Sequence, residues 1–314
     1  MAAAQTTLPT VFSGSPSGWD ASLYAFLAEK QRRSGSLRTP DSYYRTLRHF
    51  FGSIQKSPDQ VSPQDVFCFA HGVGLSGREP SPTTVSARIC CLSSFYKFLI
   101  RLDLLTSNPC DPVDRPRIQP SAPRGLTASQ VQQLVGVIPD SVKGRRDRAI
   151  VLTLVLTGRR RSEVINLNAG DISFEESAVF YLYLGKGGVR GRRELPRPAL
   201  VAIQRSLADV GKDLSSMQPS ESLWQAGAGP SGVTASTFYN RFRTYLRLAD
   251  LPPSGLHVLR HTAAKLRRDV GESVESVSQF LDHSSLAVTT TYLRRLEGQR
   301  DVAWQGVACV LGLS

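Results

Sequence analysis

The chain contains 314 residues, a length that suits two domains because a domain commonly has about 100–150 residues. Its 38 lysines and arginines outnumber the 26 aspartates and glutamates, and the net charge of +12 favours a polyanionic partner. The basic residues are spread over many segments rather than along one amphipathic helix. The longest apolar stretch, residues 149–156, is far too short to cross a bilayer. We therefore expect no membrane partner.

The first residues and the cysteines bear on the cellular compartment. Residues 1–17 lack a basic start followed by an apolar block, so no secretory signal is visible. The five cysteines leave an odd count and show no metal-ligand spacing. We interpret them as reduced, mostly buried thiols of an intracellular protein and predict a cytoplasmic location.

The N-terminal part of the chain is predicted to be helical. Residues 1–15 are small and polar and are expected to be disordered, whereas residues 16–110 show helical periodicity. Helix starts are predicted at Thr39 and at Ser81, each followed by a proline. Behind both starts the apolar residues fall on one face, which indicates a small helical domain. The outer faces carry Arg45, Arg48 and Arg88.

A proline-rich stretch, residues 111–125, is predicted to be an interdomain linker because its prolines do not fit a helix interior. Residues 126–314 form the predicted second domain, beginning with a helix cap at Thr127 and a buried helix over 147–156. Residues 178–184 and 192–196 flank a glycine-rich loop and predict an antiparallel hairpin. Helices are expected from there to the C-terminus. The expected fold is therefore mainly helical, with two domains and a small antiparallel sheet.

Four short motifs follow one another in the second domain. They are TGRRRSE at 157–163, GKG at 185–187, HVLRHT at 257–262 and LDHSSLAVTTTY at 281–292. Together they supply arginines, a lysine, histidines and a tyrosine. Guanidinium groups bind phosphate oxygens in pairs, and the other groups can transfer protons or attack phosphorus. The set predicts cleavage of a phosphodiester without a metal.

In these motifs the chain resembles the tyrosine recombinase family (phage integrase-like, Xer-like), from about residue 17 to residue 296. The family pattern T-G-x-R-x-S-E places its first arginine on Arg160, and H-x-L-R-H-T matches His257 and Arg260. The last pattern, L-G-H-S-S followed at a fixed distance by the nucleophile, matches His283 and Tyr292. The resemblance implies an N-terminal SAM-like DNA-binding bundle of four or five helices and a C-terminal mixed α+β catalytic domain.

The resemblance assigns the attacking group to Tyr292, whose phenol must lose its proton when it attacks phosphorus. A lone tyrosine would instead be interpreted as a half-buried helical residue, but the ordered motifs favour the nucleophile. Arg160 and Arg260 are expected to bind the non-bridging oxygens of the scissile phosphate, where charge builds up in the transition state.

Three further groups complete the expected site. Lys186 is the candidate general acid for the departing 5′ oxygen, although an isolated loop lysine is usually solvated. His257 is expected to act as acid/base or phosphate donor, and His283 as a hydrogen-bond donor to the same phosphate. His261 is expected to be a structural partner of His257. Zinc binding by this pair is the alternative, but the glutamate of a metalloprotease and a third ligand are missing.

Several neighbouring residues carry open alternatives. Arg159 and Arg161 flank the first arginine and are expected to bind backbone phosphates. Glu163 either holds the guanidinium of Arg160 or forms a surface ion pair. Asp282 stands where the family usually has glycine, and its carboxylate could raise the pKa of His283 or repel the phosphate.

The expected partner is double-stranded DNA with an inverted-repeat core site, and the protomers are expected to form a tetramer on it. Two domains joined by a linker would then close around the duplex, as in the family. Residues 293–314 are predicted to form a helix that docks on a neighbouring protomer or packs on its own domain. The sequence identifies no accessory protein. The candidate DNA contacts are Arg45, Arg48, Arg88, Arg159, Arg161, Arg241 and Arg243.

The chain lacks other signatures of phosphate chemistry. Neither Gly-Lys pair, at 185–186 or at 211–212, is followed by serine or threonine, so no ATP-binding loop is predicted, and no acidic cluster of the two-metal type stands out. We expect no cofactor and no metal. The predicted function is site-specific DNA recombination through a 3′-phosphotyrosine intermediate and a Holliday junction. The alternatives are a type IB topoisomerase-like enzyme and a non-catalytic DNA-binding protein on the same scaffold.

Overall fold

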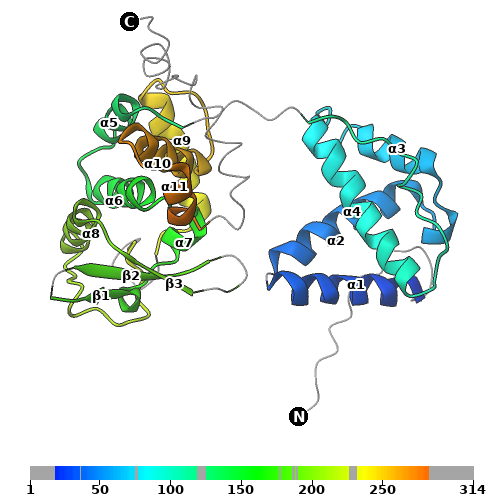
Figure 1. Cartoon of the computed structure of the whole chain (residues 1–314), viewed down its shortest axis with the longest axis horizontal. Helices are drawn as coiled ribbons and strands as arrows, with labels where there is room; N and C mark the ends of the chain where they lie inside the picture. The colour runs from blue at the N-terminus through cyan, green and yellow to red at the C-terminus, as the bar shows by residue number, and fades with distance from the viewer. Residues whose placement is uncertain are drawn as a thin grey trace, which may run out of the picture. The chain divides into compact units, whose positions relative to one another are not determined.

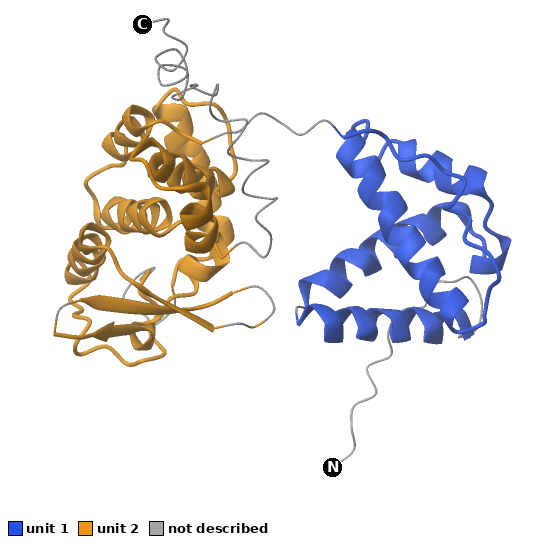
Figure 2. Ribbon diagram, in the orientation of Figure 1, with its two compact units in different colours: residues 1–120 blue, residues 121–314 orange. Residues whose placement is uncertain are grey.

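The structure is a computed structural model that describes residues 18–35, 37–74, 77–118, 125–176, 178–185, 188, 190–225 and 232–282. The predicted catalytic residues Lys186, His283 and Tyr292 and the predicted terminal helix lie outside these ranges. The chain divides into two compact units, residues 1–120 and 121–314 (Figure 2). Across the described segments, no helix is both long and apolar enough to cross a membrane.

Unit 1 is helical. Its elements are α1 (Gly18–Ser34), α2 (Arg38–Ile54), the short 3₁₀ helix η1 (Pro58–Gln60), α3 (Pro63–His71) and α4 (Pro82–Arg101). Helix α4 contacts α1, α2 and α3 and lies at the centre of the unit (Figure 1). The core is rich in phenylalanine, and the ring of Phe26 meets those of Phe95 and Phe98 edge-on at centroid distances of 5.3 and 5.5 Å. Such edge-to-face pairs add to the stabilisation from apolar burial.

The helix starts of unit 1 follow local sequence signals, with one exception. Ser81 caps α4 as predicted, because its side chain accepts a hydrogen bond from the backbone N–H of Thr84 at 3.2 Å. The prediction that Thr39 caps α2 is wrong: the helix begins at Arg38, and Leu37 precedes it without a side-chain cap. Pro40 is tolerated as the third residue of the helix because the first turn has no use for its missing N–H.

The chain after α4 stays attached to unit 1. The side-chain amide of Asn108 donates to Ser93 Oγ at 3.1 Å and to Asp111 Oδ1 at 2.7 Å. Cys110 and Val113 are buried in the same core. The predicted linker therefore starts too early at residue 111, since the chain is packed on α4 as far as residue 113.

The cysteines are more exposed than expected. Among the four that the structure describes, Cys91 and Cys110 are buried, whereas Cys68 and Cys90 are exposed. The expectation of mostly buried thiols is wrong for Cys68 and Cys90. Burial raises the pKa of the Cys91 thiol to about 12, so this side chain behaves as a small apolar group.

Unit 2 combines helices with a small sheet. Its elements are α5 (Ala128–Gly136), α6 (Val142–Thr157), α7 (Arg161–Ile165), η2 (Ala169–Asp171), β1 (Ile172–Phe174), β2 (Val179–Leu184), β3 (Arg190–Glu194), α8 (Arg197–Ala208), α9 (Ala235–Leu248), α10 (His257–Asp269) and α11 (Val274–Phe280). The strands are antiparallel in the order β1-β2-β3, at the lower end of the unit in Figure 1. The predicted hairpin corresponds to β2 and β3, whereas β1 was not predicted.

Helix α6 is the central element of unit 2 and packs against α8 and α10. Its C-terminal half is apolar and almost wholly buried, as the sequence predicts. Thr127 caps α5 through a capping box with Gln130, again as predicted. The buried indole of Trp224 donates to the carbonyl of Val164 at 2.6 Å and so fixes the end of α7 to the core. This frame positions the turn between α6 and α7, where the first motif lies.

Candidate active site

The first motif forms the turn from α6 into α7. Gly158 ends α6 in the left-handed conformation, with φ of 61°. A Cβ at this position would come within 2.6 Å of the Phe280 ring and 2.8 Å of Leu281, so only glycine fits. The chain then turns, and Arg160 occupies the position just before α7 in an extended conformation.

Glu163 holds Arg160 in this position. Arg160 Nη1 donates to Glu163 Oε1 at 2.7 Å, and the backbone N–H of Arg160 donates to Oε2 at 2.8 Å. The Glu163 side chain is 1% exposed, whereas that of Arg160 is 31% exposed. The alternative of a surface ion pair is therefore wrong, and Glu163 is a buried carboxylate that aims a partly exposed guanidinium.

Arg260 lies one turn into α10, beneath the surface that carries the Arg160 guanidinium. It is buried, and its guanidinium donates to the carbonyl of Gly158 at 2.8 Å and to that of Leu281. Desolvation, together with the positive charges of Arg160 and Arg159, lowers the pKa of Arg260 to about 10. The group is still a cation at neutral pH, and an anion placed beside it would relieve the repulsion.

His257 is the first residue of α10 and is exposed. Desolvation and the charges of Arg260 and Arg160 lower its pKa below the usual 6.5, so the imidazole is neutral at pH 7. The structure thus brings Arg160, His257 and Arg260 together. His261 packs its ring edge-on against His257 at a centroid distance of 4.6 Å. No group of three or more metal-binding side chains is formed by the described residues.

The second and fourth motifs are described only at their edges. Strand β2 ends two residues before Lys186, and Asp282 is the last described residue before His283. Asp282 has a φ of 51° and accepts a hydrogen bond from Arg193 Nη2 at 3.0 Å, as well as bonds from Arg159 and Tyr183. Its carboxylate is thus paired with two guanidinium groups, which offsets the expected repulsion of a phosphate.

The pKa of Asp282 follows from these contacts. Burial opposes ionisation, but the hydrogen bond from Tyr183, the charge of Arg159 and the hydrogen bond from Arg193 together lower the pKa of the carboxyl. Burial and the hydrogen bond to Asp282 raise the pKa of Tyr183, so its phenol stays protonated as a donor. The carboxylate is therefore ionised across the neutral range.

Arg159 does not lie where the sequence suggested. Its side chain is fully buried and donates to Asp282 and to the carbonyls of Phe280 and Thr157, the last at 3.2 Å. The guanidinium also lies over the ring of Tyr183, with 4.6 Å to the centroid. The charge of this fully buried guanidinium is paired with the carboxylate of Asp282, which favours a structural role over the predicted backbone-phosphate contact.

Two other predicted DNA contacts are engaged within the protein. Arg88 donates to the carbonyls of Phe69, Ala70 and Gly72 at 2.8–3.1 Å, where it caps the C-terminus of α3. Arg241 is paired with the buried carboxylate of Asp147. Both guanidinium groups are thus engaged within the protein, which favours a structural role over the predicted DNA contact.

The remaining predicted contacts lie at the surface. Arg45 is exposed and pairs with Asp41 at 3.0 Å. Arg48 and Arg243 are exposed, and Arg161 is half-buried. Their side chains are accessible to a phosphate from solvent.

Sequence reasoning missed the network around Asp147 in α6. This carboxylate is fully buried and accepts hydrogen bonds from Arg146 at 3.0 Å, from the Tyr245 hydroxyl at 2.7 Å and from Arg241. It ties α6 to α9. The sequence feature that could have revealed this network is the pair Arg146-Asp147 just before the buried run 149–156, because a charge in a buried segment needs a partner.

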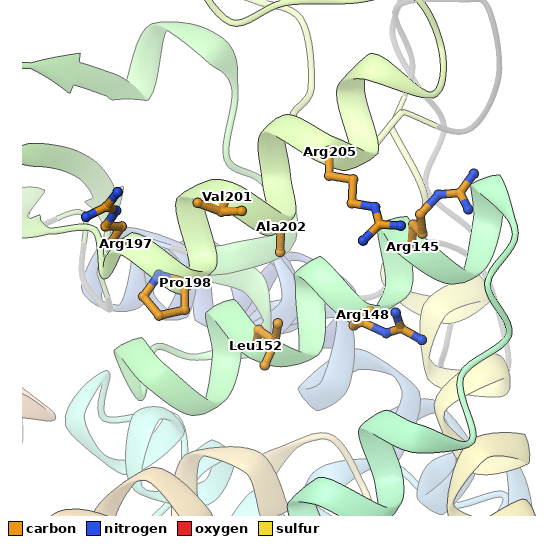
Figure 3. Close-up of a pocket in the computed structure, with 8 residues that line it drawn as sticks. All are labelled: Arg145, Arg148, Leu152, Arg197, Pro198, Val201, Ala202 and Arg205. Atoms are coloured by element: carbon orange, nitrogen blue, oxygen red, sulfur yellow. The ribbon is translucent and has the colours of Figure 1, made fainter.

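A pocket of about 520 Å³ lies between α6 and α8, away from this cluster (Figure 3). Leu152, Pro198, Val201 and Ala202 form its apolar wall. Figure 3 shows arginines placed around this wall. They are Arg145, Arg148, Arg197 and Arg205. Of the predicted catalytic residues that the structure describes, Arg160, His257 and Arg260, none lines the pocket.

Comparisons with known proteins agree with this geometry. Residues 124–298, more than half of the chain, match the phage integrase family. A tyrosine recombinase of Thermosipho africanus is 28% identical over 273 residues, covering 85% of this chain and 92% of that protein. Tyrosine recombinase XerC of Roseiflexus castenholzii is 28% identical over 243 residues, covering 74% of each.

Solved structures show the same fold. The XerH site-specific recombinase bound to difH substrate matches with a TM-score of 0.64 and 17% identity, covering 92% of this chain and 84% of that one. A lambda integrase tetramer bound to a Holliday junction matches with a TM-score of 0.68 and 15% identity, covering 90% and 79%. The predicted two-domain, mainly helical fold with a small antiparallel sheet is confirmed. The chain belongs to the phage integrase family and is a tyrosine recombinase.

Proposed function

We propose that this enzyme is a site-specific recombinase that cuts and rejoins duplex DNA through a 3′-phosphotyrosine intermediate. The observation that carries the proposal is the convergence of Arg160, His257 and Arg260 on one surface of unit 2. Two guanidinium groups beside a neutral imidazole suit a phosphodiester, because the cations stabilise developing negative charge while the imidazole can accept a proton.

In the proposed cleavage step, Tyr292 Oη forms a bond to phosphorus and its proton passes to His257. The bond from phosphorus to the 5′ oxygen breaks, and Lys186 protonates the departing oxygen. Arg160 and Arg260 bind the non-bridging oxygens, and His283 donates a hydrogen bond to the same phosphate. The products are a 3′-phosphotyrosine and a free 5′ hydroxyl.

In the second step, a 5′ hydroxyl from a partner duplex attacks the phosphotyrosine and Tyr292 leaves. One phosphodiester replaces another, so the exchange needs no external energy source. Exchange of the first strand pair gives a Holliday junction, and repeating the exchange on the second strand pair resolves it. The likeness to the lambda integrase tetramer bound to a Holliday junction supports a junction intermediate and a tetrameric assembly, which we propose forms on inverted-repeat sites.

DNA binding is proposed to rest on solvent-accessible arginines in both units. Arg45 and Arg48 in unit 1, and Arg161 and Arg243 in unit 2, are the proposed phosphate contacts. Contacts of this kind position the duplex without reading its sequence. The C-terminal residues 293–314 are proposed to pack on a neighbouring protomer in the assembly.

A nicked suicide substrate tests the cleavage step. Loss of a short oligonucleotide after cutting traps the covalent adduct, which is measured as a shifted band on a denaturing gel. Wild-type protein should form the adduct, and Tyr292→Phe should bind the DNA without forming it. Tyr239→Phe, a half-buried tyrosine on α9, is the matched control and should behave as wild type. Adduct formation by Tyr292→Phe contradicts the assignment.

A second assay separates recombination from topoisomerase activity. Recombination requires two cognate sites, whereas a type IB topoisomerase relaxes a supercoiled plasmid without them. Exchange between two site-bearing plasmids, with no relaxation of a plasmid that lacks sites, is the expected result. Relaxation of the site-free plasmid as the main activity would favour the topoisomerase alternative.

A further inference from the structure

Asp282 connects three parts of the candidate site. Its carboxylate accepts hydrogen bonds from Tyr183 in β2, from Arg193 in β3 and from Arg159 in the turn after α6. It directly precedes His283 in the chain. The two strands form the hairpin whose loop contains Lys186, and Arg159 is adjacent to Arg160. One carboxylate thus links the segments that carry three of the proposed catalytic groups.

The backbone conformation explains which residues this position accepts. With φ of 51°, Asp282 is in the left-handed region, which favours glycine and, among other residues, asparagine and aspartate. Glycine, usual here in the resembling family, satisfies the conformation but supplies no acceptor. In this chain the position therefore keeps the required backbone and adds a charged group.

The turn that carries Asp282 has other anchors. Arg260 donates to the carbonyl of Leu281, and Arg159 donates to that of Phe280. These bonds involve backbone oxygens, so they would persist if the Asp282 side chain were changed. The placement of residues 280–282 thus depends little on the carboxylate.

The β2–β3 hairpin depends on the Asp282 carboxylate more than residues 280–282 do. Tyr183 lies across Gly191, where a Cβ would come within 2.3 Å of the tyrosine ring, so the phenol is directed along β3. Its hydroxyl then reaches Asp282. Arg193 bonds to Asp282 and to the carbonyl of Gln279 at 3.1 Å. Removal of the carboxylate would take two of these hairpin contacts away and leave the bond to Gln279.

We propose that Asp282 is a positioning residue that holds the β2–β3 hairpin against the end of α11 and thereby places Lys186 at the departing 5′ oxygen. The inference rests on the proposed function, in which Lys186 is the general acid. It predicts that the carboxylate acts on protonation of the leaving group rather than on DNA binding. Misplacement of a reacting group by about 1 Å can cost about 100-fold in rate.

The test compares Asp282→Asn and Asp282→Gly with Asp250→Asn and Asp250→Gly. Asp250 is the matched control because it is exposed and also left-handed, with φ of 49°, but lies at the end of α9. Single-turnover cleavage is measured at saturating nicked substrate, alongside DNA affinity. Both Asp282 variants should cleave on the order of 10- to 100-fold more slowly with little change in Kd. The Asp250 variants should match wild type.

A substrate with sulfur in place of the bridging 5′ oxygen identifies the affected step. A thiolate leaves without protonation, because thiols have a pKa near ~8.5, far below that of an alcohol. The Asp282 variants should recover most of their rate on this substrate. An undiminished rate on the oxygen substrate, or an equal defect on both substrates, would overturn the proposal.

Folding and function are controlled separately. If the single variants unfold because Arg159 loses its partner, the pair Arg159→Met with Asp282→Gly removes both charges and is measured in the same way, since replacing a buried ion pair as a whole is often tolerated. Tyr292→Phe should cleave neither substrate. If it does cleave, the proposed function fails; if it does not and the Asp282 variants behave as wild type, only this inference fails.

Discussion

Arg160 and Glu163 form a two-point contact in which the guanidinium and the backbone N–H of the arginine donate to different oxygens of one carboxylate, at 2.7 and 2.8 Å. The carboxylate is buried and the arginine is partly exposed. The contact therefore fixes the direction of the guanidinium while leaving it accessible to a ligand.

Glu163→Gln should slow cleavage by roughly fivefold with little change in DNA affinity, because replacing a charged acceptor by a neutral one costs about 1 kcal/mol. Glu275→Gln, at an exposed position of α11, should have no effect. The measurement is single-turnover adduct formation on the nicked substrate. An unchanged rate in Glu163→Gln would show that Arg160 is directed by other contacts.

Asp147→Ala should destabilise unit 2 by about 3–5 kcal/mol, because it leaves two buried or half-buried guanidinium groups without their carboxylate. Asp140→Ala, which removes an exposed carboxylate 3.1 Å from Arg145, should cost much less, because solvent screens an exposed ion pair. Changing Trp19 and Trp304 to phenylalanine leaves Trp224 as the single tryptophan, which reports on this unit during urea unfolding. Similar losses for both variants would contradict the role of the buried network.

Arg241 and Arg243 lie two residues apart on α9 and should respond differently. Arg243 is exposed, so Arg243→Ala should reduce the slope of log affinity against log salt concentration by about 1. Arg241→Ala should lower stability, since it breaks the pair with Asp147, and should leave the salt slope unchanged. Titrations of labelled DNA at several salt concentrations measure both slopes. A reduced slope in Arg241→Ala alone would reverse the assignment.

The pH dependence of cleavage should show an acid limb below pH 6.5. Desolvation and the nearby Arg260 and Arg160 lower the pKa of His257, so the neutral base is present above this range and is lost as pH falls through the folded-state pKa. His257→Gln should be slower at pH 7 and should lack this limb. The profile is taken from single-turnover rates between pH 5 and 8. A limb that persists in His257→Gln would assign it to another group.

Much of the fold was readable from local signals. The caps at Ser81 and Thr127 and the apolar run in α6 act within a few residues, so the sequence predicts them well. Strand β1 has three residues, too few for an alternating pattern to show. The prediction of a cap at Thr39 was wrong because a proline is acceptable anywhere in the first turn of a helix.

The sequence predicts the residues of the site that belong to its motifs, but not the long-range contacts that orient them. Neighbouring arginines such as Arg159 and Arg160 look alike in sequence, yet one is buried and the other is partly exposed. The difference is set by Asp282, which lies 123 residues away in the chain. Long-range pairing of this kind leaves no local pattern, and the same holds for Arg241 with Asp147.

The chemical identity of the trapped adduct is the most direct test of the account. The complex formed with a suicide substrate is digested with protease and nuclease, and the nucleotide-bearing peptide is sequenced by mass spectrometry. The expected product is a peptide modified at Tyr292 through the 3′ phosphate of the cut strand. A nucleotide attached to a different residue, or joined through a 5′ phosphate, would contradict the proposed mechanism.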